Sequence, residues 1–168
     1  MRRIIVNVFL IILAFTVQCC IFPLLPFFTV SPNLLLILTF SFGFIHGNEA
    51  GIYYGLLAGI LLDLFYSGPF GFYTLLFINV GYFNGICTRY YYEDYITLPL
   101  ILCLINELVY NLYIYIFRFV VRGKLDIIYY AKEIIIPEMI FSVVITLLIY
   151  RFFLFANRQL SEMEKRRD

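Results

Sequence analysis

Long apolar stretches separated by short polar breaks dominate the chain. The first stretch has no charged residue from Ile4 to Asn48, which is too long for one helix across a hydrocarbon core of about 30 Å. Prolines cluster between positions 23 and 32, and proline stops or kinks a helix. The stretch therefore predicts two helices, Ile4–Phe22 and Pro32–Ile45.

The rest of the chain repeats this pattern. Polar, glycine or proline residues break it at His46–Glu49, Ser67–Gly71, Arg89–Asp94 and Arg122–Glu133. The apolar segments between these breaks predict helices over Ala50–Tyr66, Phe72–Thr88, Thr97–Val121 and Pro137–Phe155. We therefore expect one all-α transmembrane domain over residues 1–168, a polytopic integral membrane protein with about six transmembrane helices. Residues 156–168 are expected to form a short basic cytoplasmic tail.

Composition excludes a water-soluble domain. Hydrophobic residues make up 63% of the chain and charged residues only 14%, with a mean hydropathy of +0.93, whereas a soluble domain has about a quarter charged residues. The net charge of +1 gives no reason to expect nucleic acid as a partner. His46 has no second metal ligand nearby, and the cysteines lie in apolar runs. No catalytic arrangement or nucleotide-binding loop occurs, so we expect no enzyme activity, no metal and no cofactor.

The basic residues predict the orientation in the membrane. With six spans, eight of the 12 Lys and Arg residues fall on the side of the termini and four on the other side. Because Lys and Arg are enriched in cytoplasmic loops, both termini are expected in the cytoplasm. The outer four lie within Arg118–Lys132. The tyrosines at 90–92 and at 129–130 are expected at the headgroup level, as membrane anchors.

A glycine pattern marks the third predicted helix. Gly51, Gly55 and Gly59 are spaced by four and share one stripe of this helix, and Asp63 lies one turn further along. Small residues at this spacing let two helices approach closely in a bilayer. The stripe therefore indicates packing within the chain or a groove for a partner helix. Asp63 could be a headgroup-level residue, a cap on the following turn, or a specific contact, because intramembrane carboxylates usually have a partner.

The fifth predicted helix carries a polar stripe. Glu107, Asn111 and Arg118 fall within about 40° of one another at 100° per residue. This indicates an internal hydrogen-bonded helix contact, or a ligand pocket or partner interface. Glu133 and Glu138 bracket the predicted start of the last helix, where acidic groups suit the helix dipole, so we expect no special role for them.

Three motifs in order resemble the rod shape-determining protein MreD family. They are Ser31-Pro32-Asn33-Leu34-Leu35-Leu36, the glycine stripe ending in Leu62-Asp63, and Ser67-Gly68-Pro69-Phe70-Gly71. Asn33 stands where the family has Asp, so a carboxylate role is not expected there. The resemblance covers roughly residues 31–85 by motif, and the remainder by length and hydropathy.

The resemblance implies a non-enzymatic scaffold of the bacterial elongation machinery in the cytoplasmic membrane. The implied partners are an MreC-like bitopic protein, the wall synthase RodA with its class B penicillin-binding protein, and the lipid bilayer. The family fold is thought to be similar to S-components of energy-coupling-factor transporters, so a vitamin-binding S-component is the alternative. The residues expected to matter are Pro32, Gly51, Gly55, Gly59, Asp63, Gly68 and Gly71, with the two turn glycines setting the angle between the third and fourth helices.

Overall fold

The structure, a computed structural model, describes residues 2–24, 31–66, 69–90, 97–117 and 127–149. All regular elements in these ranges are helical. They are α1 (Arg2–Thr16), η1 (Val17–Ile21), η2 (Phe22–Leu24), α2 (Leu34–His46), α3 (Asn48–Phe65), α4 (Phe72–Ile86), η3 (Cys87–Tyr90), α5 (Thr97–Tyr115), α6 (Ile127–Tyr130) and η5 (Ala131–Ile135). Helix continues after η5 through residues 136–149.

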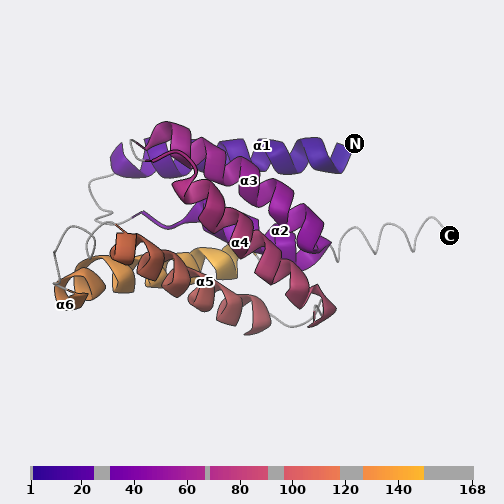
Figure 1. The fold of residues 1–168 in the computed structure, drawn as a ribbon. Helices are drawn as coiled ribbons and strands as arrows, with labels where there is room; N and C mark the ends of the chain where they lie inside the picture. The colour runs from indigo at the N-terminus through magenta and orange to yellow at the C-terminus, as the bar shows by residue number, and fades with distance from the viewer. Residues whose placement is uncertain (1, 25–30, 67–68, 91–96, 118–126, 150–168) are drawn as a thin grey trace.

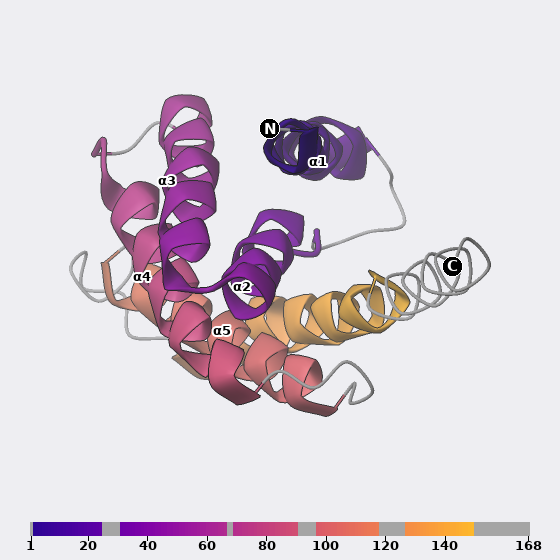
Figure 2. The ribbon, with the colours of Figure 1, turned by 90° about the vertical axis from the view of Figure 1, so that its right-hand side faces the viewer.

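The helix α2 forms the centre of the bundle. It lies between α1 on one side and α4 and α5 on the other (Figure 2). Nine of its residues are buried, on all sides of the helix, including the large side chains of Phe40 and Phe44. Because α2 is apolar around its whole circumference, burying it requires helices all round it, which accounts for its central place.

The helix α1 is peripheral, and most of its apolar surface is open (Figures 1 and 2). Ile5 and Phe9 are more than half exposed. Two segments are long and apolar enough to span a bilayer, Ile4–Leu24 and Thr97–Tyr115. An apolar helix with this much open surface is typical of one that faces lipid.

The helix boundaries follow the hydropathy pattern closely, with one exception. The first four predicted helices begin and end within about two residues of α1–η2, α2, α3 and α4 with η3, within the usual uncertainty of helix ends. The fifth begins at Thr97 as predicted, but its predicted end at Val121 lies outside the described residues, as does the tail over 156–168.

The predicted start of the last helix at Pro137 is wrong, because the chain is already helical from Ile127. A π-helical turn, η5, precedes the proline, and the Ile136 amide donates to the carbonyl of Ala131. Such a wide turn rearranges the backbone hydrogen bonds just where proline has no amide to donate. Lys132 and Glu133, which resemble a loop in sequence, lie exposed on this helical turn.

A single residue, Gly47, joins α2 to α3. Its φ of +94° lies in the region that favours glycine. The chain reverses there without a loop, so α2 and α3 pack against each other directly.

Candidate functional site

The glycine stripe lies in the contact between α3 and α4, which is the most extensive contact among helices α1–α5 in the described residues. A Cβ at Gly55 would meet the carbonyl oxygen of Phe77, and a Cβ at Gly59 would meet the backbone of Thr74. Gly51 faces the carbonyl of Gly81 in the same way. These glycines therefore bring the two backbones of this chain together, and the stripe is covered within the protein itself.

Asp63 caps the beginning of α4. Its carboxylate accepts hydrogen bonds from the amides of Gly71 (3.0 Å), Tyr73 (2.9 Å) and Thr74 (3.0 Å), and from the Thr74 hydroxyl. Backbone amides at a helix start have no partner inside the helix, and a carboxylate also favours the positive end of the helix dipole. Among the alternatives open for Asp63, the structure therefore has the cap on the following turn.

The turn between α3 and α4 depends on one of the two predicted glycines. Gly71 has a φ of +98° and precedes the first residue of α4, so a residue with a side chain would be strained there. Gly68 lies outside the described residues.

The beginning of α2 is held by uncharged side chains. Pro32 is buried just before the helix, and the Asn33 Oδ1 accepts from the Leu36 amide at 3.2 Å. Gln18 of η1 donates to the same oxygen at 3.4 Å and accepts from the Leu35 amide at 3.0 Å. An asparagine oxygen can cap a helix as an aspartate does, so this end of α2 is formed without a carboxylate.

The polar stripe of α5 points into the bundle. Glu107 and Asn111 are 0% and 1% exposed, and the Asn111 amide donates to the Glu107 backbone carbonyl at 3.1 Å. Neither carboxyl oxygen of Glu107 has a hydrogen-bond partner in the described part of the chain. The Ser142 hydroxyl lies near this carboxyl group but forms no hydrogen bond with it. Arg118 lies outside the described residues.

A second polar stripe faces α5 from the last helix and was missed in the sequence. Glu138, Ser142 and Thr146 are all buried, one turn apart, and Thr146 donates to the Cys103 sulfur of α5 at 3.2 Å. The expected place of Glu138 at a helix start is therefore wrong, because Glu138 is buried in a helix that is already formed from Ile127. Tyr130 is also only 6% exposed, so its expected place as a headgroup anchor is wrong, whereas Tyr129 is exposed. The spacing of four among polar residues of an apolar helix is the signal that could have found this stripe.

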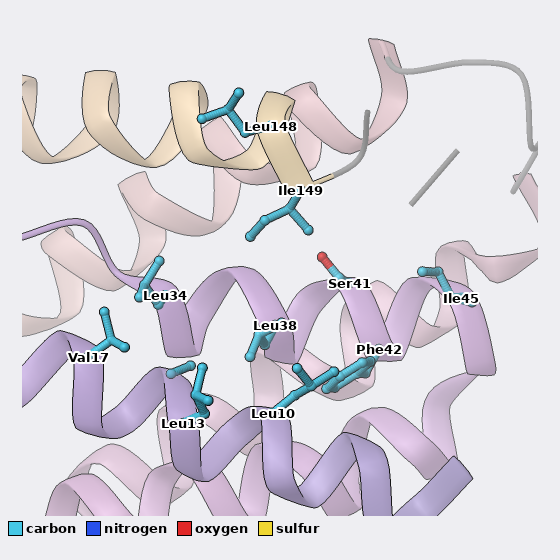
Figure 3. A pocket seen from close by; sticks show the side chains of 11 residues that line it. Leu10, Leu13, Val17, Leu34, Leu38, Ser41, Phe42, Ile45, Leu148 and Ile149 are labelled. Atoms are coloured by element: carbon cyan, nitrogen blue, oxygen red, sulfur yellow. The ribbon is translucent and has the colours of Figure 1, made fainter. Parts of the chain in front are cut away.

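An apolar groove of about 640 Å³ runs between α1, α2 and the helix over 136–149. Figure 3 shows Leu10 and Leu13 of α1 on one side, Leu38 of α2 at the centre and Ile149 on the opposite side. Its other lining residues are Ala14, Val17, Leu34, Ser41, Phe42, Ile45 and Leu148. Apolar side chains of this kind pack against another helix or a lipid chain.

Ser41 is the polar residue of the groove lining. Its hydroxyl group points toward the helix that carries Ile149 (Figure 3), but the hydroxyl oxygen is buried and has no hydrogen-bond partner in the part of the chain that the structure describes. The accessible wall of the groove is therefore apolar and suits an apolar transmembrane helix or a lipid chain.

No metal centre is formed by the described residues, since no three His, Cys, Asp or Glu side chains come together there. The candidate site that the described residues offer is thus a helix-packing surface.

Comparison with known proteins gives one match. The family model described as rod shape-determining protein MreD matches residues 1–158 of the chain. No curated protein and no solved structure matches it.

Proposed function

The chain belongs to the family of the rod shape-determining protein MreD, and from this premise we propose that it is a non-enzymatic scaffold of the elongation machinery. Members of this family are membrane proteins with a structural role in determining rod shape. The proposed partners are a bitopic MreC-like protein and, through it, RodA with its class B penicillin-binding protein. The family match gives no support to the alternative of a vitamin-transporter component.

The proposed topology has six spans with both termini in the cytoplasm. Two segments meet the length and hydropathy of a span by themselves, and the remaining helices are apolar and packed around α2. The end of the bundle at which α3 ends and α4 begins would then face away from the cytoplasm, because the N-terminus lies at the other end (Figure 1).

The apolar groove carries the proposal. The glycine stripe is covered by α4, so a partner helix needs another surface, and the groove beside α1 offers three helical walls of apolar side chains. A bitopic partner contributes a single transmembrane helix, which matches one groove of this kind. Four residues then contribute to partner binding indirectly, by fixing the shape of the bundle: Gly51, Gly55, Gly59 and Asp63.

The test is a mild-detergent pull-down of the tagged protein from native membranes, with partners identified by mass spectrometry. We expect a single-span protein with a large extracytoplasmic domain, together with wall synthases. Recovery of a pair of ABC-type ATPases with a second membrane subunit instead would contradict the scaffold.

A pair of matched variants tests the groove itself. Leu38→Trp fills its centre, whereas Leu108→Trp adds the same ring to a position of α5 that is 53% exposed. We expect the first variant to reduce recovery of the bitopic partner about tenfold, equivalent to about 1.4 kcal/mol, and the second to leave it unchanged. Equal recovery with both variants, at equal amounts of folded protein, would show that the partner binds elsewhere.

A further inference from the structure

A second, polar cavity of about 220 Å³ lies at the end of the bundle opposite the N-terminus. Side chains from six parts of the chain line it, from η1 at Gln18 to the last helix at Glu138. Tyr73 of α4, Tyr110 of α5 and Tyr130 of α6 contribute aromatic rings. A polar cavity inside a membrane helix bundle is unusual, because buried polar groups in a bilayer are costly unless they have a function.

A carboxyl group gives the cavity its chemical character. Glu138 lies in its wall and is only 8% exposed. Glu107 of α5 is fully buried and does not line the cavity. No Lys or Arg in the described part of the chain lines the cavity. A cation that enters the cavity could therefore pair with the Glu138 carboxyl group.

The neighbouring groups also suit a cation. The Asn111 amide lies against the Glu138 carboxyl group, and one of its two Nδ2 hydrogens is donated to the Glu107 backbone carbonyl. The tyrosine rings offer negative π faces to a positive charge. Tyr66 and Tyr73 pack with their centroids 5.6 Å apart, and Tyr115 and Tyr130 with theirs 5.3 Å apart, so the rings are held in place by one another.

The volume of the cavity limits the size of the molecule that it can bind. Sites for drug-sized ligands measure about 300–1,000 Å³, so a cavity of about 220 Å³ suits a smaller molecule. A metal ion would need several His, Cys, Asp or Glu ligands, and the described residues bring no three such side chains together. A short organic cation satisfies both limits.

We propose that this cavity binds a small organic cation, an ammonium or guanidinium group on a short aliphatic stem. The positive group sits between the Glu138 carboxylate and the tyrosine rings, and the stem points toward Ile114 and Ile134, which also line the cavity. This site is separate from the apolar groove, so it does not depend on the proposed scaffold function.

The first experiment measures thermal stability of the purified full-length protein in detergent with three probes. They are n-butylammonium, n-butylguanidinium and the uncharged n-butanol, at constant ionic strength. Binding to the folded state raises the melting temperature with the logarithm of the probe concentration. We expect the two cations to raise it by about 3 °C at ten times the dissociation constant, and butanol to leave it unchanged. An equal shift with butanol, or no shift with either cation, would overturn the proposal.

Two variants assign the site. Glu138→Gln removes the charge with little change of shape, and Glu133→Gln makes the same change at an exposed position of the same helix. We expect the cation-dependent shift to disappear in the first variant and to persist in the second. Persistence in Glu138→Gln would show that the cation binds elsewhere. If Glu138→Gln does not fold, n-octylammonium replaces it as the test, since its longer stem exceeds the cavity and should produce no shift.

The cation could be a free amine or a Lys or Arg side chain of another protein. If it is a side chain, the complex purified with its partners should show no shift with n-butylammonium, whereas the isolated protein does. If it is a free amine, both preparations should show the shift. Either result supports the cation site and identifies its source.

Discussion

Two buried carboxyl groups in this protein have opposite surroundings. Asp63, at the α3–α4 turn, accepts hydrogen bonds from three backbone amides and one hydroxyl. Glu107, between α5 and the last helix, has no hydrogen-bond partner for either oxygen among the described residues. Both lie in an apolar bundle where an unsatisfied carboxyl group is costly. The first group therefore holds the structure together, whereas the second contributes no side-chain hydrogen bond among the described residues.

The regions around the two groups also differ in how closely their helices pack. The α3–α4 contact brings backbones together through glycines and leaves no room even for a methyl group, whereas the cavity beside α5 stays open. A contact with every polar group satisfied and no free space is typical of a structural core. A cavity with polar groups in its wall is typical of a binding site. The comparison thus sets a closely packed helix contact against the open cavity for which we propose binding.

The largest loss of stability should come from adding side-chain atoms to the glycine contact between α3 and α4. Gly55→Ala adds only a methyl group, which in a free helix would stabilise by about 1 kcal/mol. Here the methyl group would meet the Phe77 carbonyl oxygen, so the helices must separate. We expect a net loss of about 3 kcal/mol or more, measured as a fall in melting temperature by gel filtration of a heated fluorescent fusion. Leu56→Phe, on the exposed face of the same helix, serves as the control and should melt like the parent.

A moderate effect is expected at the cap. Asp63→Ala leaves the amides of Gly71, Tyr73 and Thr74 without their acceptor, at a cost of about 2–3 kcal/mol. Asp63→Asn keeps one acceptor oxygen and should lose about half as much. The same melting assay checks both variants, with Asn79→Ala as the control, since its amide is exposed and bonds only the Leu75 carbonyl. A loss below about 0.5 kcal/mol in Asp63→Ala would show that the cap is dispensable.

The smallest effect, and one of opposite sign, is expected at Glu107. Glu107→Leu removes a buried carboxyl group that has no hydrogen-bond partner in the described residues, and replacing such a group by an apolar one is neutral or stabilising. We expect the free energy of unfolding to stay the same or to rise by about 1 kcal/mol. A loss above about 2 kcal/mol would mean that the carboxyl group is engaged in the folded state, and the contrast with Asp63 would not hold.

Much of the fold could be predicted from the sequence, because local chemistry marks the ends of its helices. Prolines precede α2, Gly47 separates α2 from α3, and glycine and proline fill the turn before α4. The start of the last helix was predicted too late, since Lys132 and Glu133 resemble a loop but lie on an exposed helical turn. The alternatives left open for the glycine stripe and for Asp63 included the contacts that the structure has.

The site residues that the sequence did not predict acquire their surroundings from contacts between helices. Glu138 next to a proline has the same local sequence whether it is exposed at a helix start or buried against α5. Gln18 lies in an apolar run with no local sign that it bonds the beginning of α2. The surroundings of both residues are set by tertiary packing, which their neighbours in the sequence do not reveal.

The shortness of α2 has a consequence for how the bilayer fits this protein. Its 13 residues rise about 20 Å, well below the roughly 30 Å of hydrocarbon that a helix exposed to lipid must match. Neighbouring helices cover most of α2, so we expect lipid to reach it only along the groove beside α1, and its short length to cause little thinning of the membrane. A helix of this length is too short to span the hydrocarbon core alone. Because the single residue Gly47 joins α2 to α3, we expect the two helices to insert into the membrane as one hairpin.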